Sequence, residues 1–236
     1  NTTVDEIGGP TVTIDAVNNA TCSDDGEIFT SINSPNGIQE IGWNSGETTE
    51  DITGLTPGYY AIWVYDNNGC VGMASATIEA ITPSPVDICL VTVDTLTTTN
   101  KVVWEKPVST EISKFRIYRE TSQAGLFQLI DSVLYSDESE YTDPVASPQV
   151  RSWRYKITSV DLCGRESDMS DDHKTIHLTI SLGLGSNINL HWDHYEGLAY
   201  STYDIWRHDV AGGWQPLVSL PTSSTSFIVA KSVANF

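Results

Sequence analysis

Apolar and polar residues alternate along most of this chain, in short runs separated by clusters of Gly, Pro, Asn, Asp and Thr. A period of two places every second side chain on one face of an extended strand, whereas the helical period is nearly absent. Many short alternating strands divided by turn residues are typical of antiparallel sandwiches. The pattern therefore predicts an all-β fold of tandem immunoglobulin-like antiparallel β-sandwiches.

The first series of runs forms one compact unit that ends near Ile81. Residues 82–87, which follow, contain two closely spaced prolines and are typical of a short, semi-stiff linker. We therefore expect a first sandwich over residues 1–82. Its expected strands are residues 11–17, 26–32, 38–43, 59–65 and 74–81.

A second series of runs has the strand number and the size of an immunoglobulin-like sandwich, so we expect a second domain over residues 83–180. The glycine-rich residues 181–187 then predict a second linker. The expected strands of this domain are residues 89–95, 100–107, 114–120, 127–133, 139–143, 152–161 and 174–180.

The chain then repeats the second series over residues 181–236, without counterparts of its last two strands. This predicts a partial third sandwich with an uncovered sheet edge and a half-open core. We expect the natural protein to continue beyond Phe236, and the start at Asn1 without a signal peptide indicates a processed or excised fragment. The repeat pairs residues 188–197 with 101–107, 203–209 with 115–121, and 214–220 with 127–133.

The charge balance excludes several classes of partner. The chain has 12 Lys and Arg residues against 31 Asp and Glu residues, a formal net charge of -19. Nucleic acids and anionic membranes would repel such a surface. Because no run approaches the roughly 20 apolar residues of a membrane helix, we also expect no membrane insertion.

Four cysteines, Cys22, Cys70, Cys89 and Cys163, are present in this β-rich chain. An even number indicates two disulfides and an oxidising compartment. No two cysteines have the spacing of a zinc site and no histidines are arranged around them. Four buried free thiols are the alternative.

The segments Thr21–Ile28 (TCSDDGEI) and Trp43–Cys70 (WNSGETTEDITGLTPGYYAIWVYDNNGC) resemble the SprB repeat family. Trp43, the Gly-x-x-Pro-Gly-x-Tyr turn and the Asn-Gly-Cys end occur in the family's order. The family occurs in large repetitive surface adhesins of gliding bacteria, which are exported by the type IX secretion system. The resemblance implies an extracellular or cell-surface location.

Residues 83–180 resemble a fibronectin type III domain, through KVVWEKP with Trp104 in the core, ISKFRIYRE, and SWRYKITSVDLCGRES. Residues 183–236 resemble a second such module, cut short. The resemblance implies a bridge from Cys89 to Cys163, and the first unit would likewise join Cys22 to Cys70. Each bridge would close a loop of roughly 50 to 75 residues, for which the chain-entropy model gives about 4 kcal/mol.

One aromatic strip is the main candidate for ligand contact. Alternation in residues 58–66 places Tyr60, Ile62 and Val64 in the core and puts Tyr59, Trp63 and Tyr65 on the opposite face. Such a strip can stack on a sugar or meet a protein partner. The alternative is that these side chains are covered by a loop or by the neighbouring module.

Metal and cofactor sites have little support. Acidic turns offer calcium candidates in Asp24, Asp25 and Asp66, but none matches the Asp-x-[DN]-x-[DN]-Gly loop, so solvated turns are the alternative. We expect no cofactor other than calcium. The histidine pairs are spaced for a helix but lie in strand-like segments, where side chains four residues apart are roughly 13 Å apart.

No catalytic motif is present. The chain has no Gly-x-Ser-x-Gly, and small sandwiches in series offer no deep cleft, although composition alone does not exclude a pair of catalytic carboxylates.

The tripeptides at Asp94–Leu96 and Asp131–Val133 resemble the Asp-Ser/Thr-apolar O-glycosylation site of these bacteria. That resemblance implies modification of Thr95 and Ser132.

These features together favour a non-catalytic stalk or adhesion region of a secreted bacterial cell-surface protein. Its expected partners are a cell-surface or extracellular molecule such as a polysaccharide, and the type IX secretion machinery. Two alternatives remain: an accessory carbohydrate-binding region of a secreted hydrolase, and a cargo captured in the secretion apparatus.

Overall fold

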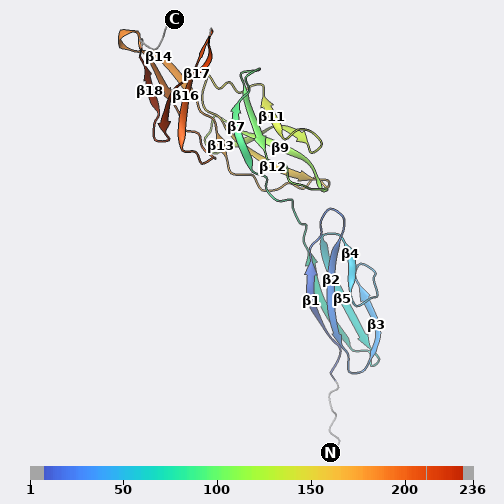
Figure 1. Cartoon of the computed structure of the whole chain (residues 1–236). Coiled ribbons are helices and arrows are strands. Elements are labelled where there is room, and N and C mark those ends of the chain that lie inside the picture. Colours follow the sequence, from blue (N-terminus) through green and yellow to red (C-terminus); the bar gives the residue numbers. More distant parts are fainter. Residues whose placement is uncertain (1–7, 211, 231–236) are drawn as a thin grey trace, which may run out of the picture. The chain divides into compact units, whose positions relative to one another are not determined.

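A computed structural model describes residues 8–210 and 212–230 (Figure 1). Within these ranges every regular element is a β-strand except one short 3-10 helix, Leu184–Ser186. Every strand pairing between them is antiparallel, which confirms the predicted all-β fold class. The chain divides into two compact units, Asn1–Thr82 and Pro83–Phe236, and each is described by itself.

The first unit is a sandwich of two three-stranded sheets, ordered β1-β2-β4 and β3-β5-β6. Ile28 from one sheet and Ile62 and Ile78 from the other are fully or almost fully buried between them. The short strand β4 escapes sequence reasoning because it contains a glycine, Gly54, with a positive φ. The strands are β1 (Thr11–Asn18), β2 (Gly26–Asn33), β3 (Ile38–Trp43), β4 (Ile52–Leu55), β5 (Gly58–Asp66) and β6 (Val71–Ile78).

The second unit begins with a complete sandwich, here called the second sandwich, with sheets β10-β9-β12-β13 and β11-β8-β7. Trp104 lies in its core, as predicted, and its ring is 5.4 Å from that of Phe115. The strands are β7 (Ile88–Val93), β8 (Asn100–Trp104), β9 (Ile112–Glu120), β10 (Phe127–Leu134), β11 (Glu140–Asp143), β12 (Arg154–Asp161) and β13 (His173–Lys174).

A polar cluster is built into one side of this core. The carboxylate of Asp143, only 1% exposed, accepts bonds from the Arg119 guanidinium at 2.6 Å and the Tyr155 hydroxyl at 3.0 Å. Its second oxygen accepts from the amides of Val145 and Ala146. Burial, and then the Asp143 charge, raise the pKa of Tyr155. A buried charge needs such partners, and this cluster supplies them to the Asp143 carboxylate inside the core.

The third sandwich differs from the sequence prediction at its start. The expected strand over residues 174–180 is wrong: β13 ends at Lys174, and β14 begins at Leu178 and pairs with β15. The glycine-rich residues 181–187 are no linker but the turn joining β14 to β15, with Gly185 and Ser186 at positive φ. The predicted boundary after residue 180 therefore falls inside a strand. The strands are β14 (Leu178–Leu182), β15 (Ile188–Trp192), β16 (Thr202–Asp209), β17 (Gly213–Pro221) and β18 (Ser226–Val229).

The sheet order of the second sandwich recurs in the third. The order β7-β8-β11 reappears as β14-β15-β18, and the pair β9-β10 as β16-β17. In the described chain no strand pairs with the free edge of β16 in the way that β12 pairs with β9. This sandwich has an apolar groove of about 680 Å³, lined mainly by aliphatic side chains, among them Ile180, Ile205 and Leu217.

Candidate functional site

The aromatic strip on β5 faces outward, as the alternation predicts. Tyr60, Ile62 and Val64 are buried on the inner face. On the other face Tyr59 is 62% exposed and Tyr65 is 38% exposed, while Trp63 is partly exposed. Among residues 8–82 of the first unit, no loop covers Tyr59.

Trp63 is held flat against the neighbouring edge strand. It pairs across the sheet with Gly42 of β3, and a Cβ atom at that glycine would lie 2.6 Å from the indole ring. The absence of a side chain at Gly42 therefore lets the ring cover the backbone of β3, which is a known way to stabilise glycine in a strand. The indole thus has a structural role and is also pre-positioned as a platform.

The same face combines apolar and polar neighbours. On β6 the partners of Tyr65 and Trp63 are Val71 and Met73, which are 48% and 66% exposed. The partner of Tyr59 is Thr77, and Glu40 of β3 lies opposite Tyr65. Aromatic rings flanked by hydroxyl and carboxylate groups can stack on a sugar and bond to its hydroxyls.

The predicted bridge between Cys22 and Cys70 is wrong, because Cys70 is an exposed free thiol. Cys22 precedes β2, whose first residue, Gly26, pairs with β4. Cys70 follows β5 and lies near Gly9 at the other end of the sheets. The two cysteines are thus separated by the length of a strand, roughly 25 Å at the usual rise per residue.

The predicted bridge between Cys89 and Cys163 is also wrong. Cys89 is a free thiol at a bulge in β7, which leaves it exposed between the buried residues Ile88 and Val91. Partial burial, and then the charges of Glu105 and Asp87, raise the pKa of the Cys89 thiol.

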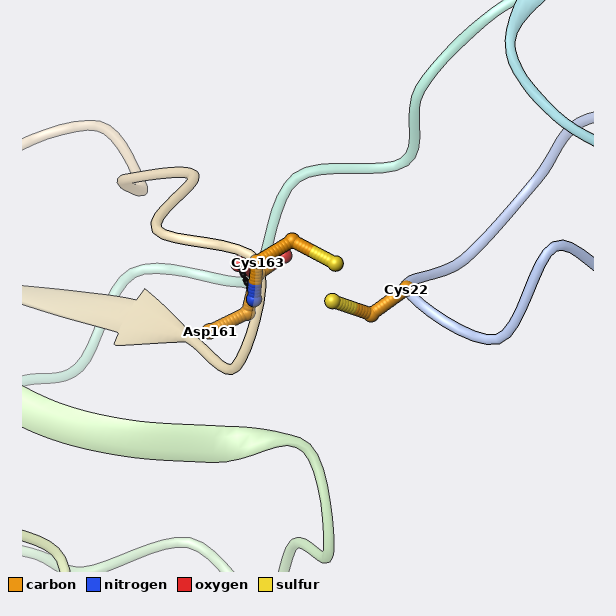
Figure 2. Close-up of side chains that lie close together, drawn as sticks. All are labelled: Cys22, Asp161 and Cys163. Atoms are coloured by element: carbon orange, nitrogen blue, oxygen red, sulfur yellow. Dashed lines mark hydrogen bonds between the residues drawn. The ribbon is translucent and has the colours of Figure 1, made fainter.

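The oxidised cysteines are Cys22 and Cys163, which are disulfide-bonded. Cys163 lies in the turn after β12, where its amide donates to the Asp161 carboxylate at 2.9 Å (Figure 2). The presence of a disulfide is in accord with the predicted oxidising compartment. Neither sandwich has the internal staple that the sequence predicted, so each depends on its own core.

We expect thiol titration of the unreduced, denatured chain to find two reactive thiols, those of Cys70 and Cys89. Reduction before denaturation should raise the number to four, since Cys22 and Cys163 then also react. Peptide mapping after alkylation identifies the cysteines. Labelling of Cys22 without reduction, or protection of Cys70, would contradict the structure.

The calcium candidates do not form one site. The Asp25 carboxylate, just before β2, accepts hydrogen bonds from the amide and the hydroxyl of Thr21. Asp66 is the last residue of β5, at the opposite end of the sheets. Asp66 is fully buried and its carboxylate accepts from Asn36, Asn68 and Cys70. The Asn36 bond is the largest cause of its lowered pKa. Asp24, exposed beside Asp25, holds the left-handed turn. The Asp25 and Asp66 carboxylates thus serve turns, and calcium remains an untested prediction.

The predicted modification sites are both exposed. Thr95 lies in the turn after β7, where the Asp94 carboxylate accepts hydrogen bonds from the backbone amides of Leu96 and Thr97. The Thr97 amide is the largest cause of a pKa of about 2 for Asp94. Ser132 lies on β10. O-glycosylation of Thr95 and Ser132 stays a prediction.

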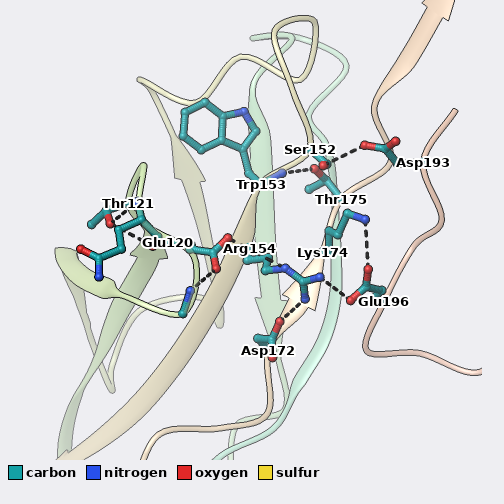
Figure 3. A network of polar contacts seen from close by, with 12 residues as sticks. Glu120, Thr121, Ser152, Trp153, Arg154, Asp172, Lys174, Thr175, Asp193 and Glu196 are labelled. Carbon is teal, nitrogen blue, oxygen red and sulfur yellow. Dashed lines mark hydrogen bonds and ion pairs between the residues drawn. The ribbon is translucent and has the colours of Figure 1, made fainter.

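Sequence reasoning missed the junction between the second and third sandwiches (Figure 3). Arg154 of β12 binds Asp172 and, at 2.5 Å, Glu196 of the third sandwich. Lys174 of β13 binds the same glutamate at 3.0 Å. Burial alone would raise the pKa of Glu196, but the bonds from Lys174 and Arg154 outweigh it and lower the pKa. No spacing reveals these pairs, because they join segments that lie far apart in the sequence.

Backbone bonds continue the sheet across this junction. Lys174 and Glu196 exchange two backbone hydrogen bonds, of 2.9 and 3.3 Å. The strand β13 therefore pairs with β12 on one side and with the third sandwich on the other. Ser152 also donates to Asp193 at 2.9 Å. A joint with both backbone and ionic contacts resists bending more than a free linker does.

We expect Gly197→Ala to weaken the junction. Gly197 has φ +105°, and a Cβ atom there would lie 2.4 Å from the His173 ring. The methyl group must therefore push the ring away or shift the backbone. Amide exchange at Lys174 should become faster, whereas exchange in β9 should not change. The control Gly212→Ala meets only the tip of Gln215 and should leave both rates as they are.

No family model and no curated protein matches this sequence. Among solved structures, the FN1-FN3 domains of chicken CNTN1 share 11% identity over 94% of this chain and 88% of that chain, with a TM-score of 0.32. The D00-D0 domain of intimin shares 13% identity over 68% and 97%, with a TM-score of 0.31. Similarity this loose carries no argument about what the chain binds.

Proposed function

We propose that this chain is a non-catalytic stalk and adhesion region of a secreted bacterial cell-surface protein. The observation that carries the proposal is that each sandwich has its own apolar core, while the acidic side chains described above serve turns, the junction and the buried pair with Arg119. The apolar groove of the third sandwich is lined mainly by aliphatic side chains. Export by the type IX system and a role in gliding rest on the SprB resemblance alone and belong to this proposal.

The extracellular location has further support. A disulfide is present, and disulfides persist in oxidising compartments. No helix in residues 8–210 and 212–230 is long and apolar enough to cross a membrane. We propose that the partner is an extracellular molecule, reached by a surface of strongly negative net charge.

The exposed strip of Tyr59, Trp63 and Tyr65 favours a second candidate function, that of an accessory carbohydrate-binding region. Rings on a flat sheet face supply stacking surfaces, and the net charge of -19 favours neutral over acidic glycans. Under this alternative a catalytic domain would lie elsewhere in the same protein.

A binding experiment separates the two functions. Affinity electrophoresis of the full chain, in gels containing xylan, mannan or β-glucan, measures binding to each glycan as retardation. If the strip binds glycan, Tyr59→Ala should abolish most of the retardation, because stacking contributes about 0.5–1.5 kcal/mol per ring beyond buried area. Trp63→Phe should retain more of it than Trp63→Ala.

Met73→Ala is the matched control, because it removes an exposed aliphatic side chain beside Trp63 and leaves the rings in place. Retardation lost in Tyr59→Ala but kept in Met73→Ala supports the carbohydrate-binding function. No retardation of the wild-type chain, together with cell-surface binding that Met73→Ala weakens, supports adhesion through a protein partner. Hydrolysis of any of these polymers by the purified chain would contradict both functions.

A further inference from the structure

The junction buries a histidine at its centre. His173 of β13 is 5% exposed, and its ring meets that of Tyr195 edge-on, with 5.9 Å between centroids. The backbone of Gly197 packs against the same ring. His173 thus belongs to the second sandwich and is enclosed by the third.

The hydrogen bonds around this ring are compatible with a neutral imidazole. The Val91 amide of β7 donates to the Tyr195 hydroxyl at 2.8 Å, and that hydroxyl lies 2.9 Å from Nδ1 of His173. A tyrosine hydroxyl carries one proton, which it can donate to an unprotonated Nδ1. A protonated ring would present a second donor to the same oxygen and leave the tyrosine proton without this acceptor.

The surrounding carboxylates oppose the effect of burial on the pKa of His173 but do not outweigh it. Burial lowers the pKa of His173, while the carboxylates of Asp172, Asp87 and Asp171 raise it by less, so the pKa lies below its ordinary value. At neutral pH the ring is therefore uncharged. The charged or titratable groups on the elements around the ring are Asp87 beside β7, Arg154 on β12, Asp171, Asp172 and Lys174 around β13, and Tyr195 and Glu196 in the third sandwich.

We propose that this junction is a pH-sensitive latch, in which protonation of His173 in mildly acidic surroundings releases Tyr195 and loosens the third sandwich from the second. The inference goes beyond a stalk function and does not depend on which ligand the chain binds. Because a buried neutral histidine binds its proton more weakly than an exposed one, docking is complete above about pH 6.5 and weakens as the pH falls below it. One linked proton changes the docking equilibrium by at most about tenfold per pH unit.

The test measures the distance between the two sandwiches as the pH changes. Spin labels are placed in the full chain through Gln128→Cys on β10 and Ser219→Cys on β17, both exposed, with Cys70→Ser and Cys89→Ser in the background. Pulsed dipolar spectroscopy should give one narrow distance near about pH 7.5 and a broader distribution near about pH 5. His173→Gln should remove this pH response, whereas His191→Gln, an exposed histidine on β15, should keep it.

A second measurement covers the case in which His173→Gln alters the junction itself. In the unsubstituted chain, NMR titration of the His173 ring should show a pKa below the ordinary value of a histidine. Tyr195→Phe removes the hydroxyl and should broaden the distances at both pH values. A response that persists in His173→Gln, a distance that does not change with pH, or a His173 ring with an ordinary histidine pKa would overturn the proposal.

Discussion

Trp104→Ala is expected to unfold the second sandwich at a much lower urea concentration than the native chain and to leave the first sandwich unaffected. Trp104 is 1% exposed and packs on Phe115. Removing a buried tryptophan leaves a cavity and costs about 3–5 kcal/mol of the free energy of unfolding. The amide NMR signals of Ile117 and Ile62, followed through a urea titration, report the second and first sandwiches separately.

Two controls belong with this variant. Trp214→Ala removes a tryptophan that is 66% exposed and should change stability by less than about 0.5 kcal/mol. Trp104→Phe keeps an aromatic ring and removes a buried indole N–H that has no acceptor among the described residues, so its loss should be smaller. An equal loss of stability in the first sandwich would show that the cores are not independent.

Arg119→Ala should have the second large effect, because it leaves the buried Asp143 carboxylate without its cation. Breaking a buried pair by removing one partner costs about 3–5 kcal/mol. Adding Asp143→Asn to Arg119→Ala should restore part of the stability. Urea titrations of the single and double variants measure both effects.

Arg116→Ala is the matched control on the same strand. Arg116 pairs with Glu166, but the two side chains are 31% and 27% exposed, so water screens the pair. Pairs of this kind contribute about 0–1 kcal/mol. A loss in Arg116→Ala as large as that in Arg119→Ala would contradict the role assigned to the buried cluster.

The sequence predicted the strands well where burial on one face imposes alternation. Residues 38–43 and β3 coincide, and the inner and outer faces of β5 are those the alternation indicated. The sequence-based prediction failed where glycine is typical of both linkers and tight turns. Gly185 was assigned to a linker, but it lies in the turn between β14 and β15. The period of a strand says which face a side chain occupies, not which end of the sheet a neighbouring turn reaches.

That limitation explains the cysteine pairing. Proximity of Cys22 to one strand and of Cys70 to another fits a bridge only if those strand ends meet, and β2 and β5 begin at the same end. The junction was invisible for a related reason. Arg154 and Glu196 become neighbours only when two separately folded sandwiches dock, and no local pattern encodes that contact.

Stretching the full chain between its termini, under reducing conditions that leave Cys22 and Cys163 as thiols, tests most directly that the fold is a series of self-contained β units. Force spectroscopy should record separate unfolding events, with Trp104→Ala lowering the force of one event and leaving the others unchanged. A single event that contains the whole length, or a Trp104→Ala chain in which all forces fall together, would contradict it.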